Sequence, residues 1–201
     1  MRPKLKYQVI YRHRAEYSVS VMCRFFGVSR SGYYDFVRRA DRPNSKWGTD
    51  ISYIHTKQGV LYLSMIRDLY DNCIVAYKTG TEQTVNLLLD TMHLAMKQVK
   101  KKVAEALQLH SDQGAQYASQ AYFEPTPTYG ITPSMSRRGN PYDNAMAENF
   151  FSILKTECIY RYKPATFSEA NEMIDRYIQF YNHERIQLKT GEAPLARRLS
   201  Y

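Results

Sequence analysis

Residues 46–66 read KWGTDISYIHTKQGVLYLSMI, and this stretch decides the fold. Its first half is a β-rich run, and Lys57-Gln58-Gly59 predicts a tight turn after it. The second run, Val60 to Ile66, is apolar on nearly every position, which is typical of a strand that is buried on both faces. The stretch therefore predicts a β-hairpin inside a layered core.

The rest of the chain extends this pattern into an α/β fold. A third antiparallel strand is expected at 73–79, a helix near 84–99, short strands at 107–110 and 131–134, and helices at 142–158 and 168–183. Residues 119–129 should be helical, but Pro125 and Pro127 argue against a regular helix there. Three strands followed by alternating helices and strands predict an RNase H-like core with a mixed five-stranded sheet.

Residues 4–39 predict a small all-α segment. Short helices are expected at 4–13 and 18–26, Gly27 should end the second, and Ser29 should cap a third that runs to Arg39. Helix, Gly-containing turn and helix form the helix-turn-helix pattern, whose second member reads the major groove of DNA. A helical module for protein contacts is the alternative. The candidate DNA contacts are Arg30, Ser31, Tyr33 and Tyr34.

Four segments follow from these patterns. We expect a basic, helix-turn-helix-like DNA-binding segment at 1–40 and a linker at 41–46, where Pro43 and Asn44 interrupt the chain. Residues 47–160 should form the catalytic core, and residues 161–201 a C-terminal helical extension of it.

Charge is concentrated at the N-terminus. The chain has a net charge of +9, and residues 1–46 hold 11 Lys and Arg against 3 Asp and Glu. Such an arm suits contact with a polyanion, although a solvated basic tail is the alternative. Cys23, Cys73 and Cys158 lack C-x-x-C spacing and should be reduced thiols. No run approaches 18 apolar residues, so we expect a cytoplasmic protein without a membrane span.

Three acidic residues stand in distinctive surroundings. Asp50 lies within an apolar strand, Asp112 follows a short strand, and Glu148, separated from Asp112 by 35 residues, lies on a helix. Each has an ordinary alternative, since carboxylates also form turns and cover helix surfaces. Together they suit a pair of Mg²⁺ ions that activates an attacking oxygen and stabilises the leaving oxygen of a phosphodiester.

The helix that carries Glu148 adds a polar stripe. Asn144, Glu148, Ser152 and Lys155 follow one another at helical spacing, which would place Lys155 on a DNA phosphate while Glu148 holds an ion. An ordinary amphipathic surface helix is the alternative. The preceding loop carries Arg137 and Arg138, which suit phosphate contacts.

These phrases resemble the catalytic blocks of bacterial insertion-sequence transposases of the integrase-like DDE type. The blocks are WGTDISYI at 47–54, HSDQGAQY at 110–117 and SMSRRGNPYDNAMAE at 134–148. The group most similar is the second-frame protein of insertion sequence family three. The stretch FYNHER at 180–185 also resembles the C-terminal signature of that group. The resemblance covers about residues 44–198 and, more weakly, residues 27–34.

The resemblance implies an RNase H-like (retroviral integrase-like) core, two Mg²⁺ (or Mn²⁺) ions and strand transfer by a 3′-hydroxyl. It gives Asp50, Asp112 and Glu148 the metal-binding roles and Lys155 a contact with the DNA end. It also implies DNA as substrate, a homo-oligomer on DNA and an upstream-frame DNA-binding protein as partner. Family members carry a longer stretch where this chain has only Asp35 to Lys46, so the sequence is internally shortened. The alternatives are a defective remnant that only binds DNA and an RNase H-type nuclease.

Overall fold

The computed structural model describes residues 3–14, 16–39, 43–99, 107–112, 114–135 and 145–200, without the side chains of residues 3–5, 8, 12, 35–39 and 145–148. The chain divides into two compact units, Met1–Asp41 and Arg42–Tyr201. Each is described by itself.

The first unit consists of three helices around a small core. They are α1 (Pro3–Arg12), α2 (Val19–Phe25) and α3 (Arg30–Arg39), close to the predicted ranges. Gly27 ends α2 with a positive φ of 60°, and the Ser29 hydroxyl accepts a hydrogen bond from the Gly32 N–H (3.0 Å), as expected of a cap. The core contains Ile10, Met22, Cys23 and Tyr33.

The second unit is built on a mixed five-stranded sheet in the order β3-β2-β1-β4-β5. Strands β1 (Lys46–Thr56), β2 (Gly59–Asp68) and β3 (Ile74–Gly80) are antiparallel, while β4 (Gln108–Ser111) and β5 (Thr132–Met135) run parallel to β1. This arrangement confirms the predicted hairpin and the predicted fold class. The second strand is buried along most of its length, as its composition predicts.

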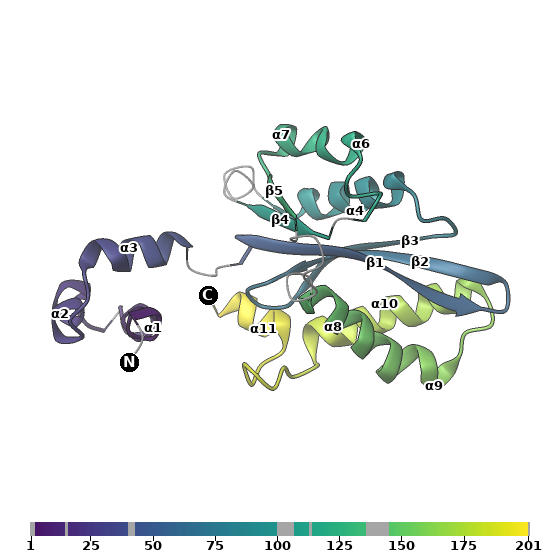
Figure 1. The fold of residues 1–201 in the computed structure, drawn as a ribbon. Coiled ribbons are helices and arrows are strands. Elements are labelled where there is room, and N and C mark those ends of the chain that lie inside the picture. The colour runs from purple at the N-terminus through teal and green to yellow at the C-terminus, as the bar shows by residue number, and fades with distance from the viewer. Residues whose placement is uncertain are drawn as a thin grey trace. The chain divides into compact units, whose positions relative to one another are not determined.

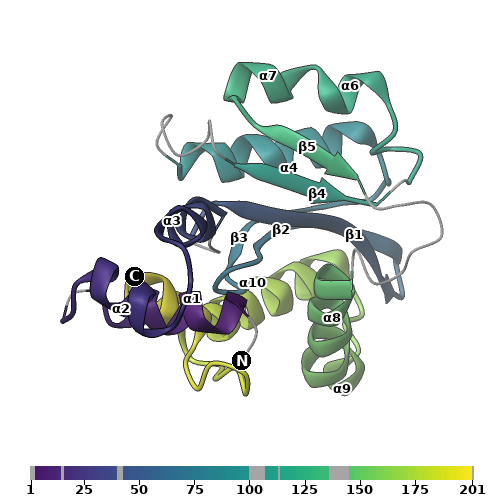
Figure 2. The ribbon, with the colours of Figure 1, turned by 60° about the vertical axis from the view of Figure 1, so that its left-hand side comes forward.

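Helices cover both faces of this sheet (Figure 1). On one face lie α4 (Val85–Lys97), α6 (Gln120–Phe123) and α7 (Pro125–Tyr129). On the other lie α8 (Ala145–Leu154), the π-helix η1 (Lys155–Ile159), α9 (Tyr160–Tyr162), α10 (Phe167–His183) and α11 (Pro194–Leu199). Figure 2 shows the same layers after rotation.

The sheet therefore separates two hydrophobic cores. One lies under α4 and contains Trp47, Met92 and Leu109. The other lies under α8 and α10 and contains Leu63, Phe150 and Ile174. Burial of apolar side chains on both faces of β2 joins the two layers into one unit.

The prediction that the prolines would disturb residues 119–129 needs refinement. The segment forms two short helices, and Pro125 opens α7, where the missing N–H has no helical partner to lose. Gly130 then ends α7 in the left-handed conformation (φ 71°).

Candidate active site

Strand pairing brings Asp50 and Asp112 to adjacent positions. Strands β1 and β4 are parallel and aligned at Trp47 with Leu109 and at Gly48 with His110. Two residues further along this register, Asp50 is level with Asp112, which directly follows β4. Neighbouring strands lie about 4.8 Å apart, so the two carboxylates belong to one site.

Side-chain alternation places both acids on the face covered by α8. Trp47 and Leu109 pack in the core under α4. Because successive side chains of a strand point to opposite faces, Asp50 and Asp112 point away from that core. Both residues are half-buried. A half-buried carboxylate pair is unfavourable unless cations or hydrogen bonds compensate it.

Backbone amides orient each carboxylate. The Ile51 N–H donates to Asp50 Oδ1 at 2.8 Å, and the Gly114 N–H donates to Asp112 Oδ1 at 2.9 Å. The second bond spans two residues and is a turn of the kind that the sequence offered as the ordinary alternative for Asp112. Here it also holds the carboxylate at the edge of the sheet, so the turn and the proposed ligand role are compatible.

Tyr117 lies beneath the pair and was missed by the sequence reasoning. Its buried hydroxyl lies 3.4 Å from the Thr49 hydroxyl, and its ring contacts Tyr122 edge-on. Burial raises the pKa of Tyr117 well above its usual value, and the nearby charges of Asp50 and Asp112 raise it further. Its place five residues after Asp112, in the same sequence block, was the available signal.

Helix α8 forms the opposite wall of the site. A cavity of about 340 Å³ is lined by Asp50, Ile51 and Ser52 from β1 and by Phe151, Ser152, Lys155, Thr156 and Tyr160 from the helical segment. Glu148 belongs to α8, one helical turn before Ser152, but its side chain lies outside the described part of the chain. The polar stripe predicted from the sequence therefore faces Asp50 at Ser152 and Lys155.

Lys155 lies between the cavity and an aromatic ring. Its Nζ is 4.4 Å from the centroid of the Tyr53 ring, a cation–π contact. Burial lowers the pKa of the Lys155 ammonium. A partly desolvated cation beside a carboxylate-bearing cavity is suited to binding a phosphate.

The donor set fits a divalent metal as far as it is described. Carboxylate oxygens are the ligands that Mg²⁺ prefers, and Asp50 and Asp112 supply two carboxylates at neighbouring positions of the sheet. Among the side chains that the structure describes, no group of three or more His, Cys, Asp or Glu is placed to hold a metal ion. Glu148, the predicted third ligand, is not in that set.

The other predicted DNA contacts have different outcomes. Arg30, Ser31 and Tyr34 are exposed on α3, where they stay candidates. Tyr33 is 2% exposed and packs in the core of the N-terminal unit, so its assignment as a DNA contact is corrected. Arg137, Arg138 and Asn144 lie outside the described residues.

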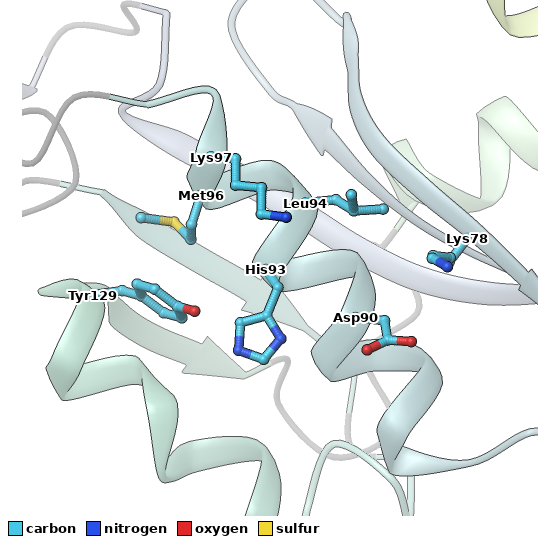
Figure 3. A pocket seen from close by; sticks show the side chains of 7 residues that line it. All are labelled: Lys78, Asp90, His93, Leu94, Met96, Lys97 and Tyr129. Carbon is cyan, nitrogen blue, oxygen red and sulfur yellow. The ribbon is translucent and has the colours of Figure 1, made fainter.

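A larger cavity lies in the helical layer on the other face of the sheet, and neither Asp50 nor Asp112 lines it. Its volume is about 510 Å³, and it is lined by residues of α4 together with Lys78 and Tyr129 (Figure 3). Asp90 is the acid that lines it, and His93 contacts the Tyr129 ring edge-on. A choice of candidate site by cavity volume alone would therefore select this cavity and miss Asp50 and Asp112.

The profile of the integrase core domain matches residues 40–141, and a second integrase core profile matches residues 129–187. Among solved structures, the magnesium complex of the HTLV-2 integrase catalytic core domain superposes with a TM-score of 0.61 at 14% identity, covering 78% of this chain and 97% of that one. A chain of the simian T-cell lymphotropic virus intasome, in complex with PP2A regulatory subunit B56 gamma, gives a TM-score of 0.67 at 15% identity, covering 94% of this chain and 73% of that one. These likenesses support the fold.

Curated relatives are bacterial. A transposase-like protein of Haemophilus influenzae is 42% identical over 150 residues, covering 75% of this chain and 68% of that protein. The transposase of insertion sequence element IS904 from Lactococcus lactis is 37% identical over 160 residues, covering 79% and 62%. Transposase InsF of insertion sequence IS3A from Escherichia coli is 36% identical over 121 residues, covering 60% and 41%.

The chain thus spans about half of the length of the curated relatives it matches. In the described residues, no helix is long and apolar enough to cross a membrane. The integrase core profile covers β1, which carries Asp50, and β4, which Asp112 directly follows. The chain therefore belongs to the bacterial insertion-sequence transposases that carry an integrase core domain.

Proposed function

We propose that this chain is a Mg²⁺-dependent polynucleotidyl transferase that cuts and joins DNA strands during transposition of an insertion sequence. The observation that carries the proposal is the placement of Asp50 level with Asp112 on adjacent parallel strands, facing the helix that bears Glu148. Membership in the transposase family and the magnesium complex of an integrase with the same fold support it.

In this proposal, Asp50, Asp112 and Glu148 hold two Mg²⁺ (or Mn²⁺) ions. When bound, such ions activate the attacking oxygen and stabilise the leaving oxygen of a phosphodiester. The backbone bonds to Asp50 and Asp112 keep each carboxylate oriented before the metal binds, which lowers the entropic cost of assembling the site. Lys155 binds a phosphate of the DNA end across the cavity.

The DNA partner would be held by more than the site itself. We propose that the basic N-terminal unit contacts DNA through Arg30, Ser31 and Tyr34, and that Arg137, Arg138 and Asn144, which precede Glu148 in the sequence, add further contacts. We also propose that the chain forms a homo-oligomer on DNA and that an upstream-frame DNA-binding protein is its partner. The activity belongs in the bacterial cytoplasm, where the element's DNA lies.

A strand-transfer assay with oligonucleotides of the element ends and Mg²⁺ tests the proposal. Asp50→Asn, Asp112→Asn and Glu148→Gln should each lower the joined product by about 1000-fold, because each removes a ligand charge. Asp90→Asn, at an exposed position on α4, is the matched control and should keep full activity. Product that survives the three site substitutions would refute the metal-site assignment.

The same assay separates the alternatives. Cleavage of an RNA–DNA hybrid without DNA joining would identify a nuclease of the RNase H type. DNA binding without any product from the unaltered chain would identify a remnant. Binding should also weaken steeply as salt rises, because the basic unit displaces counterions from DNA.

A further inference from the structure

The helical segment after α8 contains a π-helix beside the site. Residues Lys155–Ile159 form η1, and the Tyr160 N–H donates to the Lys155 carbonyl, five residues back. Such turns are rare, and they occur frequently at functional sites. The extra residue in the turn changes which side chains face the sheet and which face the cavity.

The π-turn exchanges the positions of two side chains. In a regular α-helix, the stripe through Ser152 and Lys155 would continue to Ile159, four residues on. Instead, Ile159 is 5% exposed and packs in the core with Cys158. Tyr160 takes the place on the stripe, and it lines the cavity together with Asp50, Ser152 and Lys155.

Tyr160 presents an aromatic ring to solvent at the wall of this cavity. It is 63% exposed although its neighbour in sequence, Ile159, is buried. The residues that follow include two cations, Arg161 and Lys163. An exposed aromatic beside cations is the combination with which proteins bind single-stranded nucleic acid, through stacking on bases and contacts to phosphates.

The cavity suits one nucleotide unit better than a duplex. Lys155 provides a cation, Asp50 is one of the proposed metal ligands, and the Tyr160 ring offers a flat apolar face. A base inside a duplex is already stacked on both sides, so an unpaired base is the one that can offer a free face to Tyr160.

We infer that Tyr160 stacks on an unpaired base at the DNA strand end and so positions the terminal nucleotide next to Asp50. This inference rests on the proposed function and adds a positioning residue to it. The π-turn at Lys155–Ile159 is the device that brings the ring to the cavity wall.

The test compares substitutions at two exposed tyrosines of the full chain. Tyr160→Leu removes the aromatic face but keeps apolar bulk, Tyr160→Phe keeps the face, and Tyr162→Leu is the matched control at a residue that is 73% exposed and does not line the cavity. Each is measured for binding, without divalent metal, to an element-end duplex with an unpaired 3′ overhang and to the same duplex with a blunt end.

Tyr160→Leu should weaken binding to the overhang about tenfold, because one stacked base contributes that much to affinity. Binding to the blunt duplex should change less than about twofold, and Tyr160→Phe and Tyr162→Leu should resemble the unaltered chain on both DNAs. A photoreactive 5-iodouracil in the overhang should crosslink to the peptide that contains Tyr160.

Two results would overturn the inference alone. One is equal binding by Tyr160→Leu and Tyr162→Leu while the unaltered chain binds and joins the ends; the other is a crosslink that maps elsewhere. An unaltered chain that neither binds nor joins element ends would instead overturn the proposed function, and the inference with it.

Discussion

Arg185 holds the Glu157 carboxylate in a two-pronged contact. Its Nε donates to Glu157 Oε2 at 2.9 Å and its Nη2 donates to Oε1 at 2.6 Å, while the Tyr177 hydroxyl donates to Oε2 at 2.6 Å. Glu157 lies in η1, between Lys155 and Tyr160, and Arg185 follows α10. The contact therefore fixes the segment that forms one wall of the candidate site to α10 and the residues that follow it.

We expect Arg185→Leu to lower the free energy of unfolding by about 2–3 kcal/mol. The substitution removes charge-assisted bonds from a half-buried carboxylate, which is then left with Tyr177. Urea unfolding at neutral pH measures the loss. Arg185→Lys should recover part of it, because a lysine keeps the charge but not the fork.

Acid should reduce the difference in unfolding free energy between Arg185→Leu and the unaltered chain. The bonds from Arg185, opposed by burial and aided by Tyr177, lower the pKa of Glu157 below its usual 4.5. A lowered carboxyl pKa contributes stability above the unfolded value, and the contribution is lost as the pH falls through the folded value. The gap between Arg185→Leu and the unaltered chain should therefore narrow below pH 4.5.

Arg176→Leu provides the matched control on α10. Arg176 is 77% exposed, its partner Glu172 is 62% exposed, and the pair lies one helical turn apart. Exposed pairs of this kind contribute about 0.5 kcal/mol. A loss from Arg176→Leu as large as that from Arg185→Leu would show that the Glu157 contact has no special role.

Arg198→Leu should cost more, about 3–5 kcal/mol. Arg198 donates to Asp71 Oδ2 at 2.7 Å and to Asp68 Oδ2 at 2.9 Å, and both carboxylates are fully buried. Removing the guanidinium leaves these charges without its compensation, and a broken buried pair is strongly destabilising. Arg197→Leu is the control, since Arg197 lies over the Tyr70 ring and should contribute about 1 kcal/mol or less.

Asp68 should make stability fall as the pH rises from about 4 to about 6. Burial, and then the charge of Asp71, raise the pKa of Asp68 from 3.8 to about 6. The folded state then binds this proton more tightly than the unfolded state, so its contribution is complete below pH 3.8 and is lost as the pH rises through about 6.

Unfolding experiments across this pH range test the assignment. Asp68→Asn should flatten the slope between pH 4 and 6, whereas Asp90→Asn on the exposed face of α4 should leave it unchanged. An unchanged slope in Asp68→Asn would assign the pH dependence to another group.

The sequence predicted the strands better than it predicted the buried charges. The runs at 51–54 and 60–66 mark β1 and β2 because their composition reflects burial along the strand itself. A local interpretation would have Asp68 and Asp71 bracket the turn between β2 and β3. They do so, but they also bind Arg198, about 130 residues away, and local sequence carries no sign of such a partner.

The site shows the same division. The phrases around Asp50 and Asp112 predicted their strands, and pairing of β1 with β4 brings the two together. Helical periodicity alone, however, would place Ile159 rather than Tyr160 on the polar stripe. The period of 3.6 residues assumes a regular α-helix, so it does not reveal a π-turn. Tyr33 was assigned to DNA because it lies on the expected recognition helix, and packing against α1 and α2 buries it instead.

Gly114→Ala should reduce activity while leaving the fold intact. A Cβ at this position would lie 3.0 Å from Asp112 Oδ1, the same oxygen that accepts the Gly114 N–H. The carboxylate must then shift by a few tenths of an ångström, which would displace the proposed metal ligand from its position. We expect about a tenfold loss of strand transfer at limiting Mg²⁺, with partial recovery at high Mg²⁺.

Gly80→Ala is the matched control, because its Cβ would meet Leu87 at an ordinary 3.4 Å, far from the acids in sequence and on another strand. Equal Mg²⁺ dependence in the two variants would mean that the position of Asp112 does not limit the reaction.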